Sequence, residues 1–272
     1  MGSQAERVAT FRDLHASGCF VIPNPWDIGS ARTLARLRFK ALATTSSGFA
    51  WTLGRSDNAV SLEEVLAHLR AIAASVEVPV NADFEGGFAV EPEAVAANVT
   101  RAVDTGIAGI SIEDSTADAA DPLFDAELAV ERIRAARVAI DASGTGVLLT
   151  GRSEGFIVGR PDLPETIRRL VAYAEAGAEC LYAPGLRAAS DIAAVVDAVS
   201  PTPVNVLVGS DFTTVAELAA LGVRRISVGG ALARTAWGGF LRAATELAEH
   251  GAFGGFADAV PFAELDDSFR MG

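Results

Sequence analysis

Acidic residues follow two apolar stretches of the chain, in the runs Asn81-Ala-Asp-Phe-Glu-Gly-Gly87 and Ser111-Ile-Glu-Asp114. Each apolar stretch is typical of a buried strand, so each run places carboxylates at the end of a strand. If the two strands are neighbours, Asp83, Glu85 and Glu113 converge on one point. Hard carboxylate oxygens gathered there predict a site for Mg²⁺, or for Mn²⁺, that holds an oxygen-rich substrate.

Each candidate residue also has a purely structural interpretation. Asp83 and Glu85 could cap helices or pair with arginines, although the period of a strand places both on the same side. Arg152 is either an ion-pair partner of Glu154 or a fork that binds a substrate carboxylate through two hydrogen bonds. The run Ser46-Ser-Gly48 is either an ordinary turn or a small oxyanion nest of hydroxyl and backbone N–H groups.

Eight strand-like apolar runs alternate with helical patterns along the whole chain. The runs cover residues 19–23, 41–45, 78–82, 109–112, 147–150, 180–183, 204–208 and 225–228. Helical spacing of apolar residues is clear over 62–74, 95–104, 128–141 and 166–175. Gly106, Gly177 and Gly222 fall just past such helices, where a left-handed cap is favoured. Eight such units joined by right-handed crossovers, in about 250 residues, predict a closed (β/α)₈ TIM barrel of the α/β class.

The organisation of the chain favours one domain over residues 1–272. An open doubly wound sheet would favour a Gly-rich phosphate motif after the first strand, and Ile22-Pro-Asn-Pro-Trp-Asp27 is not one. No linker or low-complexity segment interrupts the alternation. The tail, residues 251–272, is rich in Gly and Phe and carries acidic residues, so it is either a docking segment or a loosely packed end.

Composition excludes several classes of partner. The net charge of −13, without any basic stripe, argues against nucleic acid. Cys19 and Cys180 lie in apolar runs outside any CxxC pair, as in reduced cytoplasmic proteins. The N-terminus has no apolar core of a signal peptide, and no apolar run reaches membrane-spanning length. We therefore expect a cytoplasmic protein that does not engage a membrane.

Several kinds of catalysis lack the residues that they need. The single lysine, Lys40, precedes the second strand and so lies on the stability face, which leaves a Schiff-base aldolase without its nucleophile. His15, His68 and His250 lie in helical patterns away from strand ends, which argues against a Ser-His-Asp triad or a His-ligated zinc ion. Metal-assisted carboxylate chemistry remains.

Taken together and in this order, the motifs resemble the isocitrate lyase/phosphoenolpyruvate mutase superfamily, in its phosphonomutase-like bacterial branch. The resemblance spans nearly the whole chain, through Asn24-Pro-Trp-Asp-Ile-Gly-Ser-Ala31, Ala43-Thr-Thr-Ser-Ser-Gly48, Ala82-Asp-Phe-Glu-Gly-Gly87, Ile112-Glu-Asp-Ser115, Pro203-Val-Asn-Val-Leu207 and Ile226-Ser-Val-Gly229. It implies a (β/α)₈ barrel whose eighth helix often swaps between subunits of a homodimer or homotetramer.

The resemblance also implies roles for individual residues. Asp83 would touch Mg²⁺, and its water shell would be held by Asp57, Glu85 and Glu113. A small-molecule carboxylate substrate would be bound by Ser47, Gly48, Phe49 and Arg152, with Asn205 on the far side of the pocket. Catalysis would then depend on Arg152 and on a proton supplied by Asp57, by Glu85 or by a metal-bound water.

The chain departs from the superfamily pattern in the loop that governs the reaction. Lyases carry Lys-Lys-Cys-Gly-His or Lys-Arg-Cys-Gly-His after the fourth strand, whereas residues 115–124 here contain no Cys, His or Lys. Mutases have a histidine after the sixth strand, where this chain has Ala183-Pro184. These departures argue against cleavage of isocitrate or methylisocitrate.

We therefore expect a Mg²⁺-dependent lyase that cleaves or decarboxylates a small 2-oxo or 2-hydroxy carboxylic acid through an enolate intermediate. Two alternatives remain open. One is P–C bond chemistry, as a mutase or hydrolase of phosphonopyruvate-like substrates, and the other is a non-catalytic carboxylate-binding protein.

Overall fold

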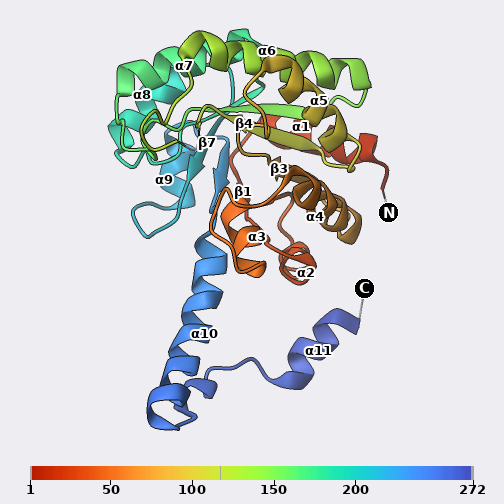
Figure 1. Ribbon diagram of the computed structural model, residues 1–272, viewed down its shortest axis with the longest axis vertical. Helices are drawn as coiled ribbons and strands as arrows, with labels where there is room; N and C mark the ends of the chain where they lie inside the picture. Colours follow the sequence, from red (N-terminus) through yellow and green to blue (C-terminus); the bar gives the residue numbers. More distant parts are fainter. Residues whose placement is uncertain (1, 117, 271–272) are drawn as a thin grey trace.

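The computed structural model describes residues 2–116 and 118–270, and within them eight parallel strands curve into a barrel (Figure 1). Outside the described residues lie residue 1, residue 117 of the loop 115–124, and residues 271–272 of the tail. The strands are β1 (Phe20–Ile22), β2 (Leu42–Ala43), β3 (Val80–Asp83), β4 (Gly109–Glu113), β5 (Leu148–Arg152), β6 (Cys180–Tyr182), β7 (Val204–Leu207) and β8 (Arg225–Ser227). All eight predicted strands and the (β/α)₈ class are confirmed.

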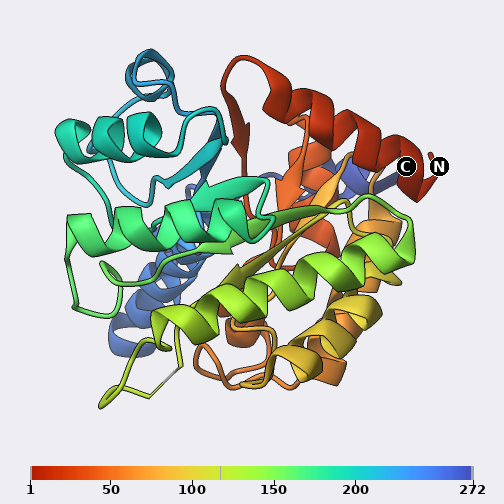
Figure 2. The ribbon, with the colours of Figure 1, turned by 90° about the horizontal axis from the view of Figure 1, so that it is seen from above.

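The strand order carries the sheet almost all the way round. Neighbours follow one another as β1-β8-β7-β6-β5-β4-β3-β2. Between the two remaining edges, β1 and β2, the amide of Ala43 donates a hydrogen bond of 3.1 Å to the carbonyl of Pro23. The barrel is therefore nearly closed, and in Figure 2 the helices surround its strands.

The helices alternate with the strands. They are α1 (Gln4–Ala16), α2 (Ile28–Arg36), α3 (Ser46–Thr52), α4 (Leu62–Ser75), α5 (Pro92–Val103), α6 (Ala126–Ser143), α7 (Leu163–Glu175), α8 (Ala189–Val199), α9 (Val215–Ala220), α10 (Ala231–His250) and α11 (Phe262–Arg270), with a short 3₁₀ helix η1 (Gly254–Phe256). Gly106 and Gly177 follow α5 and α7 with φ of +90° and +105°. These are the left-handed positions that the sequence predicted.

Helix α4 illustrates why the sequence forms these helices where it does. The amide of Glu64 donates to the hydroxyl of Ser61 at 3.4 Å, and the amide of Ser61 donates to the Glu64 carboxylate at 3.0 Å. This capping box satisfies backbone donors that have no partner within the helix. Val65, Leu69 and Ile72 then recur at helical spacing and are buried against the barrel. A cap followed by an apolar stripe fixes both the start and the orientation of the helix.

Strand β4 shows how one strand supplies both the core and the site. Ile110 and Ile112 are fully buried in the apolar core between the sheet and the helices. Ser111 and Glu113 alternate with them and face the barrel interior. Ser111 is in register with Asp83 of β3, and Glu113 is in register with Arg152 of β5. Polar side chains of three strands thus meet inside the barrel.

Helix α1 lies across the amino ends of the strands. A Cβ atom on Gly109 of β4 would lie 2.5 Å from the ring of Phe11, so glycine leaves the room that this ring needs. Arg12 donates from Nη2 to the carbonyl of Gly146, just before β5, at 2.8 Å. Because α1 packs against this end of the barrel, the candidate site lies at the opposite end.

Residues 231–270 form an arm that leaves the barrel (Figure 1). Helix α10 projects away from the strands, and α11 at its far end returns toward α2, where Nη1 of Arg36 donates to the carbonyl of Ser268. The arm carries large exposed apolar side chains, among them Phe240 (59% exposed) and Phe262 (82%). The tail predicted as a docking segment or a loose end is therefore largely helical. Among the described residues, no helix is both long and apolar enough to cross a membrane.

Candidate active site

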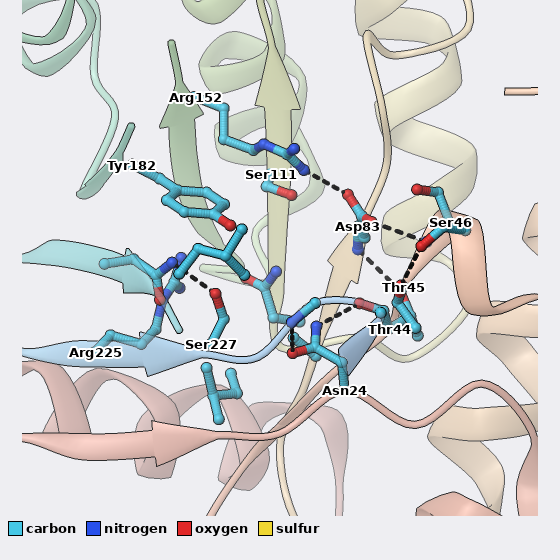
Figure 3. Close-up of a pocket in the computed structure, with 18 of the residues that line it drawn as sticks. Asn24, Thr44, Thr45, Ser46, Asp83, Ser111, Arg152, Tyr182, Arg225 and Ser227 are labelled. Carbon is cyan, nitrogen blue, oxygen red and sulfur yellow. Dashed lines mark hydrogen bonds and ion pairs between the residues drawn. The ribbon is translucent and has the colours of Figure 1, made fainter. Parts of the chain in front are cut away.

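A cavity of about 290 Å³ opens at the carboxyl ends of the strands (Figure 3). It is lined by residues from all eight strand ends or the loops after them, including Asn24, Thr44, Ser47, Asp57, Asp83, Ser111, Arg152, Tyr182, Asn205, Arg225 and Ser227. The lining is rich in hydroxyl, amide and carboxylate groups. This volume is close to the lower bound of ligand pockets, which favours a small polar molecule.

Arg152 stands at the centre of an acidic cluster. Its Nη1 lies 2.8 Å from Oδ1 of Asp83, its Nη2 lies 3.0 Å from Oε2 of Glu113, and its Nε lies 2.8 Å from Oε1 of Glu154. Burial works against the charge, but the three carboxylates dominate and raise the pKa of Arg152 well above its ordinary value. The guanidinium is thus permanently charged, and each of its three nitrogens already has a carboxylate partner.

Asp83 connects this cluster to the next strand round the barrel. Its Oδ2 accepts from the amide of Ser46 at 2.9 Å, and its own amide donates to the hydroxyl of Thr44 at 2.9 Å. Thr44 directly follows β2, and Ser46 is the first residue of α3. The carboxylate that the resemblance assigns to the metal is therefore held from two sides, by Arg152 and by the backbone of Ser46.

Asp57 completes the acidic wall of the cavity, and Glu85 lies in a small adjoining pocket that Asp83 also lines. Burial, followed by the charge of Asp83, raises the pKa of Asp57. Burial, followed by the charges of Asp83 and Asp57, raises the pKa of Glu85 to about 8. Glu85 also has a positive φ of 46°, which a non-glycine residue seldom adopts and which marks a constrained turn. Burial thus disfavours the charged form of both carboxyls, and the neighbouring acids add to this effect.

The convergence of Asp83, Glu85 and Glu113 takes a different form from the one predicted. Asp83 and Glu113 meet on the guanidinium of Arg152, which occupies the centre of the cluster. Among residues 2–116 and 118–270, no three His, Cys, Asp or Glu side chains are grouped so that they could hold a metal ion directly. The predicted three-acid cluster is thus an arginine-centred cluster, because the long Arg152 side chain reaches across from β5.

The donor chemistry nevertheless fits Mg²⁺ or Mn²⁺. Asp57, Asp83 and Glu85 offer only hard oxygen atoms, and a nearby divalent cation would oppose the burial and the repulsion that raise the pKa values of Asp57 and Glu85. Mg²⁺ usually keeps several water ligands and binds one or two carboxylates directly. An acidic wall without a tight three-residue cluster suits that mode of binding.

Asp114, the last residue of the second acidic run, has a structural role. Its Oδ1 accepts from the amide of Glu154 at 2.7 Å. Its Oδ2 accepts from the hydroxyl of Tyr173 at 2.6 Å and from Nη1 of Arg169 at 3.1 Å, both on α7. Asp114 thereby anchors Glu154, and through it Arg152, to the outer helix layer.

The Ser46-Ser-Gly48 run begins helix α3, so it is neither an isolated turn nor a free nest. Thr45 caps the helix, and Ser47 lines the cavity. A Cβ atom on Gly48 would lie 2.6 Å from Cγ2 of Thr45, so only glycine lets the helix pack this closely. Phe49 lies behind Ser47, where its ring stacks on His68 with 3.8 Å between centroids. Of these three predicted substrate contacts, Ser47 is the one that faces the cavity.

Asn24 and Asn205 hold the remaining walls. Asn24 donates to the carbonyl of Thr44 at 2.8 Å and accepts from the amides of Val228 and Gly229 at 2.9 Å each, so it links β1, β2 and β8. Asn205 lines the cavity, as the resemblance implied.

Sequence reasoning missed Arg225 and Tyr182, which also line the cavity. Tyr182 ends β6, so its position at a strand end was an available signal. Arg225 begins β8, so its position in the sequence does not mark it as a residue at the carboxyl end of a strand.

The chain resembles known proteins in both sequence and fold. The sequence profile of a family described as phosphoenolpyruvate phosphomutase matches residues 11–248. A crystal structure of a candidate lyase/mutase from Burkholderia cenocepacia J2315 is 48% identical, with a TM-score of 0.94, and the match covers 98% of this chain and 96% of that one. The oxaloacetate decarboxylase of Rhodopseudomonas palustris (strain HaA2) is 28% identical over 79% of this chain and 74% of its own. The structure of oxaloacetate acetylhydrolase with its product oxalate is 27% identical, with a TM-score of 0.85, and the match covers 98% of this chain and 93% of that one.

Proposed function

The chain belongs to the phosphoenolpyruvate mutase/isocitrate lyase superfamily, and we propose that it is a Mg²⁺-dependent lyase of a small 2-oxo or 2-hydroxy acid. The bond broken joins the carbon adjacent to the carbonyl to its next carbon, by C–C cleavage or by loss of CO₂, and the electron pair left on the adjacent carbon forms the enolate. The observation that carries the proposal is the acidic wall of the cavity, where burial raises the pKa of Asp57 and of the adjoining Glu85 beside the Asp83–Arg152 ion pair.

The inventory of the cavity supports this class of reaction. Its lining contains no lysine, cysteine or histidine among the described residues, so covalent catalysis by those groups is not available. The groups that remain are carboxyls, one serine-rich helix start and arginines. Such groups can bind an acid, polarise it and move a proton, which is what enolate chemistry needs.

Asp83, together with Asp57, Glu85 and Glu113, would hold the metal, which would act as a Lewis acid for the oxygen on which enolate charge develops. The residues of this chain perform the other tasks. Ser47 and the start of α3 orient the 2-oxo acid end of the substrate. Arg152 keeps a positive charge beside that end. Ile157, Leu207 and Tyr182 also line the cavity and contribute apolar surface to it.

Glu85 and Asp57 are the groups that can return a proton to the enolate carbon. Without a metal ion, burial and the neighbouring acids raise the pKa of the Glu85 carboxyl to about 8, so it then carries a proton at neutral pH, and a bound cation would lower that pKa and favour release of the proton. Asp57 also has a raised pKa and lines the cavity directly, which makes it the second proton carrier.

The relatives support the substrate class. An oxaloacetate decarboxylase and an oxaloacetate acetylhydrolase, at 28% and 27% identity, are both named for a 2-oxo acid. The present chain shares with them the fold on which such acids are processed, and its acidic wall is suited to the same type of substrate.

The test is a turnover assay on the purified protein with Mg²⁺, using a panel of 2-oxo and 2-hydroxy acids. Proton NMR would follow loss of substrate and formation of pyruvate or another enolate-derived product. Deuterium from D₂O should enter the product at the carbon that was protonated. The absence of any turnover across the panel, with Mg²⁺ and with Mn²⁺, would refute the proposal.

A further inference from the structure

Arg225 occupies the wall of the cavity that faces the acidic wall. It is only 2% exposed, yet it lines the cavity. In Figure 3, Arg225 and Ser227 lie on one side of the cavity, and Asp83 and Ser46 lie on the other. The cavity therefore has an acidic pole at Asp83 and a basic pole at Arg225.

Strand register explains how the first residue of β8 reaches the site. Register pairs join Glu113 to Arg152, Arg152 to Tyr182, Tyr182 to Asn205, and Asn205 to Arg225. Residues in register on parallel strands point to the same side of the sheet. One row of side chains thus runs across β4, β5, β6, β7 and β8, and it carries one arginine near each end.

The hydrogen-bond partners of Arg225 are all neutral. Its Nε donates to Oδ1 of Asn205 at 2.9 Å, and its Nη2 donates to Oγ1 of Thr150 at 3.1 Å. Its Nη1 lies 3.4 Å from Nε2 of His15, whose Nδ1 donates to the carbonyl of Phe11 at 2.7 Å. His15 therefore acts as an uncharged acceptor. A guanidinium has five N–H groups, so these contacts leave two of them without a partner.

The charge of Arg225 is not offset by any acid in the part of the chain that the structure describes. Two other arginines are at least nine-tenths buried. Arg169 pairs with Asp114 and Glu165, and Arg132 stacks on the ring of Phe124 outside the cavity lining. A buried charge without a counterion is costly, and an arginine cannot escape that cost by losing its proton. The counter-charge is therefore to be sought in the cavity itself.

We propose that Arg225 is a second anion-binding residue of the substrate site and that it binds a carboxylate at the end of the substrate remote from the 2-oxo or 2-hydroxy group. This inference rests on the proposed function, which places the 2-oxo end at the Asp83 pole. Arg152 is less suited to this second carboxylate, because three carboxylates already surround it. The substrate is then a diacid, and Arg225 distinguishes it from a monoacid of the same shape.

The experiment compares two stable ligands that differ only at the remote end: malate and 2-hydroxybutanoate, which has a methyl group in place of the second carboxylate. Calorimetric titration of the full chain with Mg²⁺ should show about tenfold to a hundredfold tighter binding of malate, the contribution of charged hydrogen bonds. In Arg225→Gln this preference should disappear while the affinity for 2-hydroxybutanoate is unchanged. Arg224→Gln is the matched control, since its side chain contacts the carbonyl of Gly18 on the exposed surface, and it should behave as the wild type.

A second variant covers the case in which Arg225→Gln does not fold. Asn205→Asp keeps the size of the side chain but places a carboxylate against Nε of Arg225, so it should neutralise the basic pole and also abolish the preference for malate. Equal affinities of the wild type for both ligands, or a preference for malate that survives in the folded variants, would overturn the proposal. These are binding measurements, so a failure here is separate from the absence of turnover that would refute the lyase.

Discussion

The guanidinium of Arg152 and the carboxylate of Asp83 form an ion pair of 2.8 Å, although strand β4 separates the strands that carry them. Both side chains are 16% exposed, so water screens the pair only weakly. The pair links β5 to β3 across β4, the strand that carries Ser111. It also orients the Asp83 carboxylate so that Oδ2 accepts a hydrogen bond from the amide of Ser46. Asp83 is therefore oriented before any ligand arrives.

Replacement of Asp83 tests this orientation. Asp83→Asn should reduce kcat/KM by about a hundredfold or more, because even residues that only support a metal ligand cost about 10- to 100-fold when replaced. Stability should change less, since Arg152 keeps Glu113 and Glu154 as partners. Steady-state kinetics and thermal unfolding of the same samples measure both. Asp104→Asn, on an exposed helix end, is the control, and equal losses in the two variants would contradict the assignment.

Metal binding can be followed without turnover. Addition of Mg²⁺ should raise the unfolding midpoint, because a ligand that binds only the folded state stabilises it by about 2.7 kcal/mol at a hundred times its Kd. Differential scanning fluorimetry over a series of Mg²⁺ and Mn²⁺ concentrations measures the shift. In Asp83→Asn the shift should shrink or vanish. A shift that is identical in the variant would place the ion elsewhere.

The barrel was predictable because local patterns determine it. Apolar runs of strand length, amphipathic helices and glycine caps such as Gly106 and Gly177 need no knowledge of the partner strand. The positions of Asp83, Glu113 and Arg152 at strand ends followed from the same patterns. The contacts between those side chains could not be predicted from the same patterns.

Side-chain partners depend on register, which the sequence does not show. The side chain of Arg152 on β5 reaches past β4 to contact Asp83 on β3. Asp114 belongs to the same acidic run as Glu113, but its side chain faces α7. Arg225 was missed for a related reason. Strands of a barrel are staggered, so the first residue of β8 lies level with Tyr182 at the end of β6. Counting along one strand cannot reveal this.

Acid should destabilise the protein through His15. Burial, followed by the charge of Arg225, lowers the pKa of His15 to about 3, against about 6.5 in the unfolded chain. Between these values the unfolded chain binds a proton that the folded protein does not. This contribution to stability is fully present above pH 6.5 and is lost as the pH falls toward 3, amounting to about 2 kcal/mol at pH 5.

Urea unfolding at pH 7 and pH 5 measures this loss. His15→Gln keeps an acceptor near Arg225 and should lose about 2 kcal/mol less than the wild type over this interval. The carboxyl groups are the same in both proteins, so their contributions to the pH dependence of stability cancel in this comparison. An unchanged pH dependence in His15→Gln would show that the pKa of His15 is not lowered in the folded protein.

The apolar arm, residues 231–270, predicts self-association. Trp237, Phe240 and Leu241 are 39%, 59% and 54% exposed on α10, which projects away from the barrel (Figure 1). Contiguous apolar surface of this kind marks an interaction site, and we propose that a second copy of the chain covers it. Light scattering should then give a mass that is a multiple of 28.1 kDa.

A double variant, Phe240→Glu with Leu241→Glu, should reduce that mass to a single chain, because two buried charges would oppose the apolar contact. Val138→Glu changes an equally exposed side chain on α6 and should leave the mass unchanged. A wild-type mass of 28.1 kDa at all concentrations would mean that the arm serves no contact between copies.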